Sequence, residues 1–351
     1  MPFLRITPDA KASGMGETGV ATTPDLNSLY WNNAKLAFLG GDYGGSIGYT
    51  PWLSTLKAGI TSMYATGFRK LDESQVISIA MNYFTLGQVN YYDELSNAIG
   101  SYNPNELSVE IGYGRQISPE MGLGITAKYL HSDLAIGSFA GAGGVKPAAD
   151  IAFDIGWYYE EKEYDNTHFS YGAFLSNIGP KLKQMFGSES QFLPMNLRLG
   201  TQYHVSSDQN DNSMNFSLDI NKLLVPTPPI YQKDTNGNET NIILRGSSPN
   251  KSVPGAIFGS FSDAPNGFSQ NMEQFTVSLG GEYIIQNKVS LRSGYHFESA
   301  SLGDMRYFTF GLGYTAPTMR IDCSYIAPLG QANPYKNTFR ITLGFNVLRE
   351  N

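Results

Sequence analysis

The chain has 351 residues, of which 16% are charged and 13% are aromatic, and its formal net charge is −7. Soluble domains carry about 25% charged residues, so low charge with 22 Tyr, 20 Phe and 38 Gly is typical of an outer-membrane β-barrel and tolerable for a β-propeller. The absence of a Lys/Arg run argues against a nucleic-acid binder. A single cysteine, Cys323, excludes an intrachain disulfide and a multi-thiolate metal site, and the lack of a long apolar run excludes a transmembrane helix.

The N-terminal segment, residues 1–33, does not alternate like a strand and contains three prolines and several glycines. Met1-Pro2-Phe3 lacks the basic start and the apolar stretch of a secretory signal, so we expect a mature or trimmed sequence. A segment of this composition can fold inside a barrel as a plug. The candidate plug residues are Arg5, Asp9, Gly14, Gly16 and Gly19.

Residues 14–19 match the G-x-G-x-x-G pattern of dinucleotide-binding loops. That pattern binds a pyrophosphate only between a parallel strand and the N-terminus of a helix. No such unit is indicated around it, so we interpret these glycines as positions that permit tight turns.

Fourteen later segments alternate between apolar residues and small or polar residues, which is the pattern of strands with one buried or lipid-facing side. In the clearest segment, Val289, Leu291 and Tyr295 share one face and Arg292 lies on the other. Most segments approach the roughly 9–13 residues that a tilted strand needs to cross a bilayer. The segments are 43–52, 57–68, 76–86, 107–114, 121–129, 151–157, 168–177, 196–204, 214–224, 275–285, 289–297, 308–314, 318–326 and 339–347.

The polar face of these strands is rich in Gly, Ser, Thr and Asn, with scattered charges such as Glu110, Lys128, Glu282 and Arg292. A soluble sandwich would carry more Lys and Glu there, whereas a barrel lumen needs small residues that leave room for a plug or water. An open sheet edge in hydrocarbon would leave backbone groups unpaired. We therefore predict an all-β fold, a 14-stranded antiparallel transmembrane β-barrel over residues 34–351, with residues 1–33 as a lumenal plug.

Connection lengths alternate along the chain, as they do in outer-membrane barrels. With both chain ends on the periplasmic side, the internal turns are short and the external connections 87–105, 132–147, 179–194 and 225–271 are long. Aromatic residues near the strand ends suit two interfacial girdles, with Trp52 on the outer side and Trp157 on the inner side. We expect an integral outer-membrane protein that contacts lipid and presents its loops at the cell surface.

The long loop 225–271 is the best candidate for partner contact. Loops that face water seldom contain several Phe and Ile residues without burial, so these residues either dock on another protein or pack on the mouth of their own barrel. Loops 137–147 and 179–194 are further candidates. The candidate partner-binding residues are Ile230, Tyr231, Ile257, Phe258, Phe261, Phe268, Phe139 and Phe186.

We predict no catalytic residue, metal site or cofactor. Residues 234–239 faintly resemble a calcium loop, but the glycine is misplaced and the closing Glu is absent. The histidines, His131, His168, His204 and His296, lie on separate strands without metal-ligand spacing. No G-x-S-x-G, H-E-x-x-H or P-loop motif is present. Cys323 is expected to face lipid as a small apolar residue.

The stretches Phe3–Ala21 and Leu29–Ala37 resemble the mature N-terminus of the PorV (LptO) family. In the wider FadL-like superfamily a proline is usual where this chain has Asn33. The resemblance implies a fourteen-stranded barrel with a lumenal plug that serves the type IX secretion system of Bacteroidetes. It also implies binding to the SprA translocon, receipt of secreted cargo that carries a C-terminal signal domain, and delivery of that cargo to the PorU-containing attachment complex.

Two functions from different classes follow. The first is a non-enzymatic secretion component whose external loops bind a translocon and cargo. The alternative is a FadL-like outer-membrane transporter of hydrophobic small molecules, with an apolar lumenal pocket and the N-terminal segment as a gate. The small, polar lumen face disfavours a fatty-acid pocket. An outer-membrane deacylase, a third hypothesis, lacks a nucleophile–base pair in this sequence.

Overall fold

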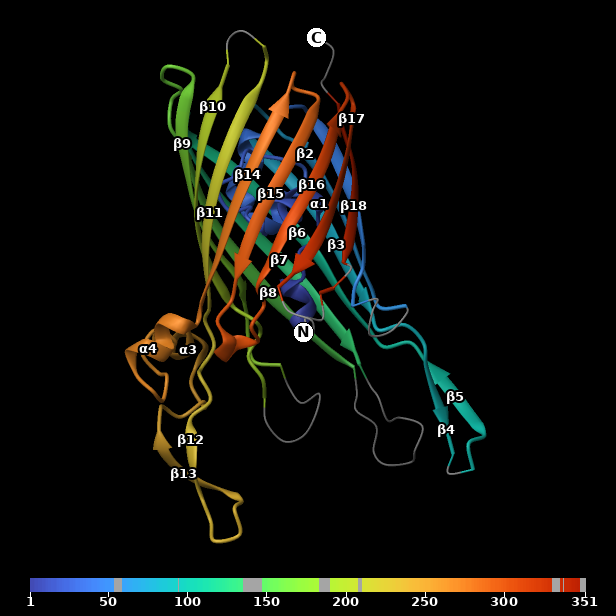
Figure 1. Cartoon of the computed structure of the whole chain (residues 1–351), viewed down its shortest axis with the longest axis vertical. Coiled ribbons are helices and arrows are strands. Elements are labelled where there is room, and N and C mark those ends of the chain that lie inside the picture. The colour runs from blue at the N-terminus through green and yellow to red at the C-terminus, as the bar shows by residue number, and fades with distance from the viewer. Residues whose placement is uncertain are drawn as a thin grey trace.

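The computed structural model describes residues 1–53, 59–93, 95–134, 147–182, 190–207, 210–329, 335–336 and 338–347. Within these residues, fourteen antiparallel strands close into a barrel (Figure 1). The strands are β1 Tyr43–Pro51, β2 Thr61–Lys70, β3 Gln75–Thr85, β6 Asn105–Ser118, β7 Met121–Asp133, β8 Ala148–Glu160, β9 Thr167–Ile178, β10 Asn196–Ser206, β11 Ser213–Leu223, β14 Phe275–Ile285, β15 Val289–Phe297, β16 Tyr307–Thr315, β17 Met319–Pro328 and β18 Phe339–Val347.

The barrel closes between its first and last strands. β1 pairs with β18, with Tyr43 opposite Val347 and Tyr49 opposite Ile341. Closure pairs the backbone groups that would otherwise lie unpaired at a sheet edge. The predicted segments 275–285, 289–297 and 339–347 coincide with β14, β15 and β18. The predicted fourteen-stranded antiparallel barrel is therefore confirmed.

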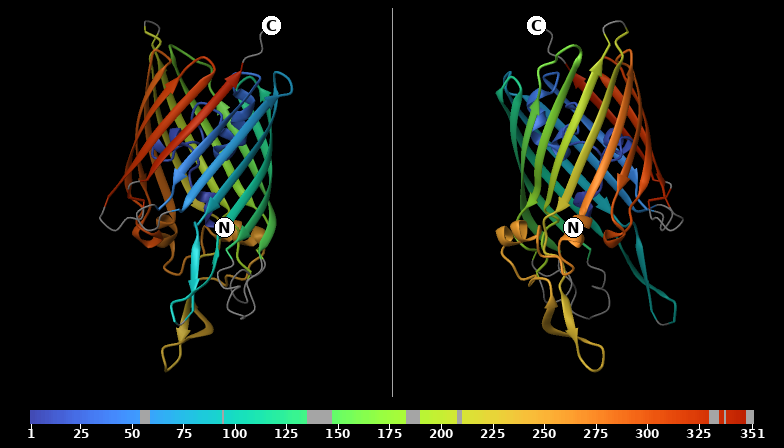
Figure 2. Two further views of the ribbon diagram at one scale, coloured as in Figure 1. Left: turned by 90° about the vertical axis from the view of Figure 1, so that its right-hand side faces the viewer. Right: turned by 60° about the vertical axis from the view of Figure 1, so that its left-hand side comes forward.

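Short turns and long connections lie at opposite ends of the barrel (Figures 1 and 2). The long-loop end carries two small hairpins, β4 Val89–Tyr92 with β5 Ala98–Tyr102 and β12 Ile230–Lys233 with β13 Glu239–Arg245. It also carries the helices α3 Val253–Gly259 and α4 Phe268–Glu273 and the 3-10 turn η3 Ala300–Leu302. The predicted alternation of connection length is confirmed.

The expectation that both chain ends lie at the short-turn end is wrong. β18 ends there, but the N-terminus lies at the long-loop end (Figure 1). The amine of Met1 is 3.7 Å from Glu106 Oε1 on the external rim. The chain therefore passes along the lumen before β1 begins, a path that the alternation of the strands does not reveal.

The two faces of the wall differ as predicted. Large apolar residues such as Ile111 and Leu312 point outward and are 64% and 61% exposed, while small and polar residues point inward. Trp157 and Tyr159 stack on the outward face with ring centres 6.4 Å apart. Trp52 is an exception: it is 7% exposed, so its expected place in a lipid-facing girdle is wrong. It lies just beyond β1 and packs against Tyr335, with ring centres 4.7 Å apart and ring planes tilted by 55°.

Residues 1–39, which we call the lumenal segment, lie inside the barrel (Figure 2). They form η1 Pro2–Arg5, α1 Ala10–Gly14, α2 Ser28–Trp31 and η2 Asn33–Phe38. α1 contacts β16 and β17, and η2 contacts β6, β7 and β8 on the other side of the lumen. No helix among the described residues is long and apolar enough to span a bilayer.

Candidate functional site

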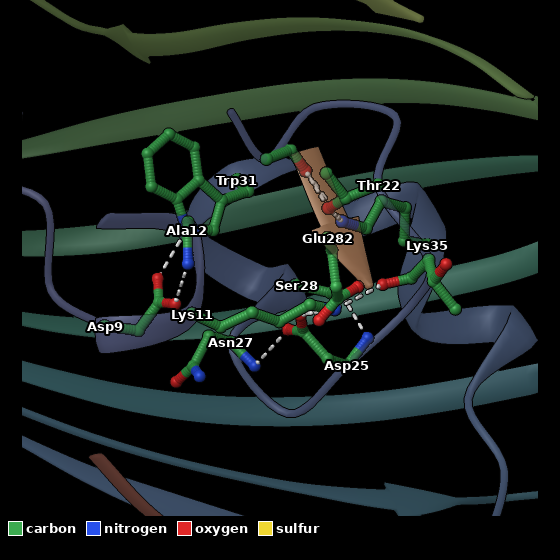
Figure 3. Close-up of polar contacts among 12 residues, drawn as sticks. Asp9, Lys11, Ala12, Thr22, Asp25, Asn27, Ser28, Trp31, Lys35 and Glu282 are labelled. Atoms are coloured by element: carbon green, nitrogen blue, oxygen red, sulfur yellow. Dashed lines mark hydrogen bonds and ion pairs between the residues drawn. The ribbon is translucent and has the colours of Figure 1, made fainter. Parts of the chain in front are cut away.

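Asp9 organises the start of the lumenal segment. Its carboxylate accepts a hydrogen bond from the backbone N–H of Ala12 at 2.8 Å, as the N-cap of α1, and another from Trp31 Nε1 at 2.6 Å. Nearby, Lys11 Nζ lies 2.8 Å from Asp25 Oδ2 (Figure 3). These buried contacts join α1 to the turn before α2 and to α2 itself, so the segment folds as one unit inside the barrel.

The three candidate glycines of the lumenal segment occupy positions where a side chain does not fit. A Cβ at Gly14 would lie 2.9 Å from the Cα of Gly311 on β16, and a Cβ at Gly19 would overlap the indole of Trp31. Gly16 has a φ of +68°, in the left-handed region that favours glycine. Close packing and turn geometry therefore explain the G-x-G-x-x-G match.

The barrel wall binds the lumenal segment through polar side chains. Asp219 on β11 accepts hydrogen bonds from the backbone N–H groups of Gly19 and Val20 at 2.7 and 3.0 Å. Arg340 on β18 donates to the hydroxyl of Ser13. These contacts come from strands far apart in sequence and fix the segment at two points of the wall.

Other lumenal charges pair with each other. Arg292 on β15 lies 2.7 Å from Glu282 Oε1 and 2.8 Å from Asp322 Oδ1. Lys128 on β7 lies 2.8 Å from Asp154 Oδ2 on β8. All five side chains are more than nine-tenths buried. Among the described residues, no three His, Cys, Asp or Glu side chains are grouped so that they could hold a metal ion.

A cavity of about 500 Å³ lies at the long-loop end, between the lumenal segment and the barrel wall. Trp31, Trp52 and Phe84 supply apolar surface. The charged residues that line the cavity are Arg198 on β10, Arg5, Glu17, Glu106 and Glu298. Arg198 is 7% exposed, and its guanidinium carbon lies 4.9 Å from the ring centre of Trp31. Its Nη1 has no hydrogen-bond partner among the described residues. Arg5, a predicted plug residue, is exposed at the rim. Sequence reasoning missed this cavity because its residues come from many strands.

The hairpin β12–β13 lies in the first half of the long loop and projects away from the barrel (Figure 1). The predicted partner residue Ile230 is 42% exposed. Tyr231 is half-buried and lines a cavity of about 840 Å³ beside Phe192 of loop 179–194. Leu244 on β13 is 61% exposed and extends the apolar surface, although it was not among the predicted residues.

The second half of the long loop forms α3 and α4, which lie beside the barrel rim (Figures 1 and 2). Ile257 is half-buried, whereas Phe261 is exposed. Phe258 and Phe268 are each 77% exposed. The structure therefore brings these four predicted residues together in one part of the loop but exposes them unequally. The two remaining candidates, Phe139 and Phe186, lie outside the described residues.

The calcium-like segment 234–239 is the turn of the β12–β13 hairpin. Asp234 Oδ1 accepts hydrogen bonds from the backbone N–H groups of Asn238 at 2.9 Å and Asn236 at 2.8 Å. These bonds favour the charged carboxylate and hold the pKa of Asp234 below its ordinary value. The carboxylate of Asp234 thus accepts hydrogen bonds from backbone groups of its own turn. This agrees with the interpretation of the segment as a polar turn.

Two of the histidines face each other across the sheet. His168 on β9 is opposite His204 on β10, with ring centres 4.7 Å apart. Sequence reasoning missed this pair because it depends on the register between two strands. His204 Nδ1 also lies 2.7 Å from Asn215 Oδ1, so the pair belongs to a lumenal polar network.

Comparison with protein families identifies the group to which this chain belongs. The model of the family "Type IX secretion system protein PorV" matches residues 1–230, well over half of the chain. The chain belongs to the PorV family. It is therefore an integral outer-membrane barrel of the type IX secretion system. A search of curated proteins finds no match.

Several solved structures share the fold. The toluene transporter TodX of Pseudomonas putida is 12% identical, with 96% of each chain covered and a TM-score of 0.55. The toluene transporter TbuX of Ralstonia pickettii is 13% identical, with 96% of this chain and 97% of that chain covered and a TM-score of 0.51. A FadL homologue of Pseudomonas aeruginosa is 9% identical, with 97% and 98% covered and a TM-score of 0.50. At these identities, the likeness shows a FadL-like barrel fold.

The family match ends at Ile230, the first residue of β12. The matched part contains the lumenal segment and the strands up to β11. Almost all of the hairpin β12–β13, and both helices α3 and α4, lie beyond it. Their roles must therefore be argued from their own residues.

Proposed function

We propose that this chain binds the SprA translocon and receives secreted cargo that bears a C-terminal signal domain. In this proposal the chain then delivers the cargo to the PorU-containing attachment complex. Membership of the PorV family supports a role with the secretion machinery. The observation that carries the proposal is the exposed apolar hairpin β12–β13 above a lumen that is filled by protein.

The filled lumen favours docking over passage. The lumenal segment runs through the barrel, and its helices contact strands on opposite sides of the wall. The described part of the lumenal segment therefore leaves a protein cargo no open path through the barrel, and the exterior supplies the binding surface. The hairpin offers Ile230, Ile242 and Leu244, each more than 40% exposed. Ile242 and Leu244 share one face of β13, while Ile230 on β12 pairs with Arg245. Exposed apolar residues gathered on one loop commonly mark protein interfaces.

The test is recovery of partners from a detergent extract of secreting cells by a tagged form of this chain. The wild-type chain should recover a very large outer-membrane protein and secreted precursors. The combined variant Ile230→Ser, Ile242→Ser, Leu244→Ser should lose them, because the apolar contact surface is removed. Heat-modifiable migration in gels should be unchanged, since these residues lie outside the barrel.

The matched control is Ile99→Ser on the other external hairpin, β4–β5, where the isoleucine is 50% exposed. This variant should recover partners as well as the wild type does. Full recovery by the triple variant would remove the hairpin from the proposal. Failure of the wild-type chain to recover any secretion protein would reject the proposed function itself.

The cavity at the barrel mouth favours one alternative, a FadL-like transporter of hydrophobic small molecules. Its aromatic wall and the open Nη1 of Arg198 suit an apolar molecule with an acidic end. Mass spectrometry of lipid extracted from the purified chain distinguishes the two functions. A stoichiometric fatty acid that disappears in Arg198→Gln, without any recovered protein partner, would favour the transporter.

A further inference from the structure

Helix α3 is apolar on every side. Its residues, Val253–Gly259, read Val-Pro-Gly-Ala-Ile-Phe-Gly, and none has a polar side chain. A helix that is apolar all round is expected to be buried on all sides. Here one side is buried and the other is open, because Ala256 is 0% exposed while Phe258 is 77% exposed.

The buried side of α3 rests on the outer wall of the barrel. On β11 the outward-facing residues are even-numbered, as the exposed Phe216 and Ile220 show. Leu224 continues this outward series just past the strand end, and it is 2% exposed because it packs with Ala256 and Met195. Leu175 and Leu197, from β9 and β10, border the same cluster. The helix therefore covers positions that would otherwise continue the lipid-facing surface.

A buried lysine also indicates that this part of the loop packs on the outer wall of the barrel. Lys222 also lies on the outward-facing series of β11, yet it is 1% exposed. Its Nζ donates to Gln274 Oε1 at 2.7 Å and lies 5.5 Å from the ring centre of Phe261 and 5.1 Å from that of Phe275. The loop thus shields the charge on the outer wall, as a charge beside lipid requires.

The open side of this part of the loop is almost uncharged. Between Ser252 and Met272 the only charged residue is Asp263, which is 3% exposed and lies 3.1 Å from Lys251 Nζ. The one exposed charge within the two helices is Glu273, the last residue of α4. Phe268 and Met272 lie one helical turn apart on α4 and are 77% and 45% exposed. In contrast, the neighbouring hairpin contains Lys233, Asp234, Glu239 and Arg245. The helices lie beside the rim, whereas the hairpin extends further from the barrel (Figures 1 and 2).

We propose that α3 and α4 lie in the outer leaflet of the membrane and that Phe258, Phe268 and Met272 contact lipid. The exposed surface of the two helices is continuous with the lipid-facing wall on which they pack. Helices that lie in the interface bury their apolar face at the boundary between headgroups and acyl chains. The two halves of the long loop then have different solvents: the hairpin is in water and the helix pair is in lipid. This assignment replaces the protein contact that the sequence suggested for Phe258 and Phe268.

The test measures collision rates of a nitroxide label in phosphatidylcholine–phosphatidylglycerol vesicles that contain only this chain. The labels are placed by Phe258→Cys and Phe268→Cys in a Cys323→Ala background, since Cys323 is the only native cysteine. Oxygen concentrates in the acyl region and a nickel chelate stays in water. We expect both labels to collide with oxygen more often than with the chelate, as a label at Leu291→Cys on the lipid-facing side of β15 should do.

The matched control is Leu244→Cys on the hairpin, an exposed leucine at which the chelate should dominate. Chelate dominance at Phe258 and Phe268 as well would overturn the proposal. Labels that neither reagent reaches would also overturn it, because protein, such as a second copy, would then cover the surface. As an independent measurement, brominated phosphatidylcholine should quench the fluorescence of the tryptophan that Phe258→Trp adds. None of these measurements needs a secretion partner, so they remain decisive if the proposed function fails.

Discussion

The inner and outer faces of a single strand, β16, show the reverse of the pattern in a soluble sheet. On the inner face, Thr309 is fully buried and its hydroxyl accepts a hydrogen bond from the backbone N–H of Gly16 at 2.8 Å. Gly311 touches the backbone of the lumenal segment. On the outer face, Phe310 and Leu312 are 53% and 61% exposed. Polar and small residues are buried, and large apolar residues are exposed.

This inversion shows that two solvents surround the wall. Lipid stabilises exposed apolar side chains, while the lumenal segment provides hydrogen bonds and close backbone contact within. The mean hydropathy of −0.24 hides the arrangement, because it averages the two faces. Substitutions on the inner face should therefore act through pairing and packing, and those on the outer face through transfer into lipid.

The largest effect is expected from Arg292→Met on the inner face. Among the described residues, Arg320 then remains as the ion-pair partner of Glu282 and Asp322, at 4.0 and 2.7 Å respectively, and Asn215 still donates to Glu282 Oε2. Removing one partner of a buried ion pair costs about 3–5 kcal/mol. Urea unfolding from lipid vesicles, followed by tryptophan fluorescence, measures the free energy of unfolding. The triple change Arg292→Met, Glu282→Leu, Asp322→Leu should recover part of the loss, and a wild-type value for Arg292→Met alone would contradict this account of the inner face.

A smaller loss is expected from Leu312→Arg on the outer face. An arginine at the middle of a lipid-facing strand costs about 2–4 kcal/mol. The control is Leu244→Arg on the hairpin, where the leucine is equally exposed, at 61%. There the change in unfolding free energy should be within about 0.5 kcal/mol, as for most surface substitutions. Equal losses of unfolding free energy at the two leucines would show that both lie in the same solvent. That result would contradict the assignment of the outer face of β16 to lipid.

Alternation along the chain predicted the barrel well because it is a local property. Segment 289–297 could be placed from its own residues, since the side-chain period of a strand is two. The glycines at positions 14, 16 and 19 could likewise be recognised as structural. Each of these inferences needs only neighbours in sequence.

The remaining features depend on contacts between distant residues. The pairing of His168 with His204 needs the register of β9 against β10. The burial of Trp52 depends on Tyr335 near the other end of the chain. The position of α3 on the outer wall depends on Leu224 and Met195, whose outward direction is visible only once the barrel is closed. Sequence reasoning found the exposed phenylalanines but could not assign their surroundings.

The smallest loss of unfolding free energy is expected from a substitution in the lumenal segment, which should weaken that segment more than the wall around it. Asp9→Ala removes the N-cap of α1 and the acceptor for Trp31 Nε1. Losing an N-cap costs about 0.5–2 kcal/mol, less than either wall substitution, because the strands and their ladder remain. The local effect should exceed the global one: trypsin should cut the lumenal segment at Lys11 faster in Asp9→Ala than in the wild type. Ser252→Ala, which removes the cap of α3 outside the barrel, should leave that cleavage unchanged. If Asp9→Ala lowered the free energy of unfolding as much as Arg292→Met, the lumenal segment and the wall would unfold as one cooperative unit.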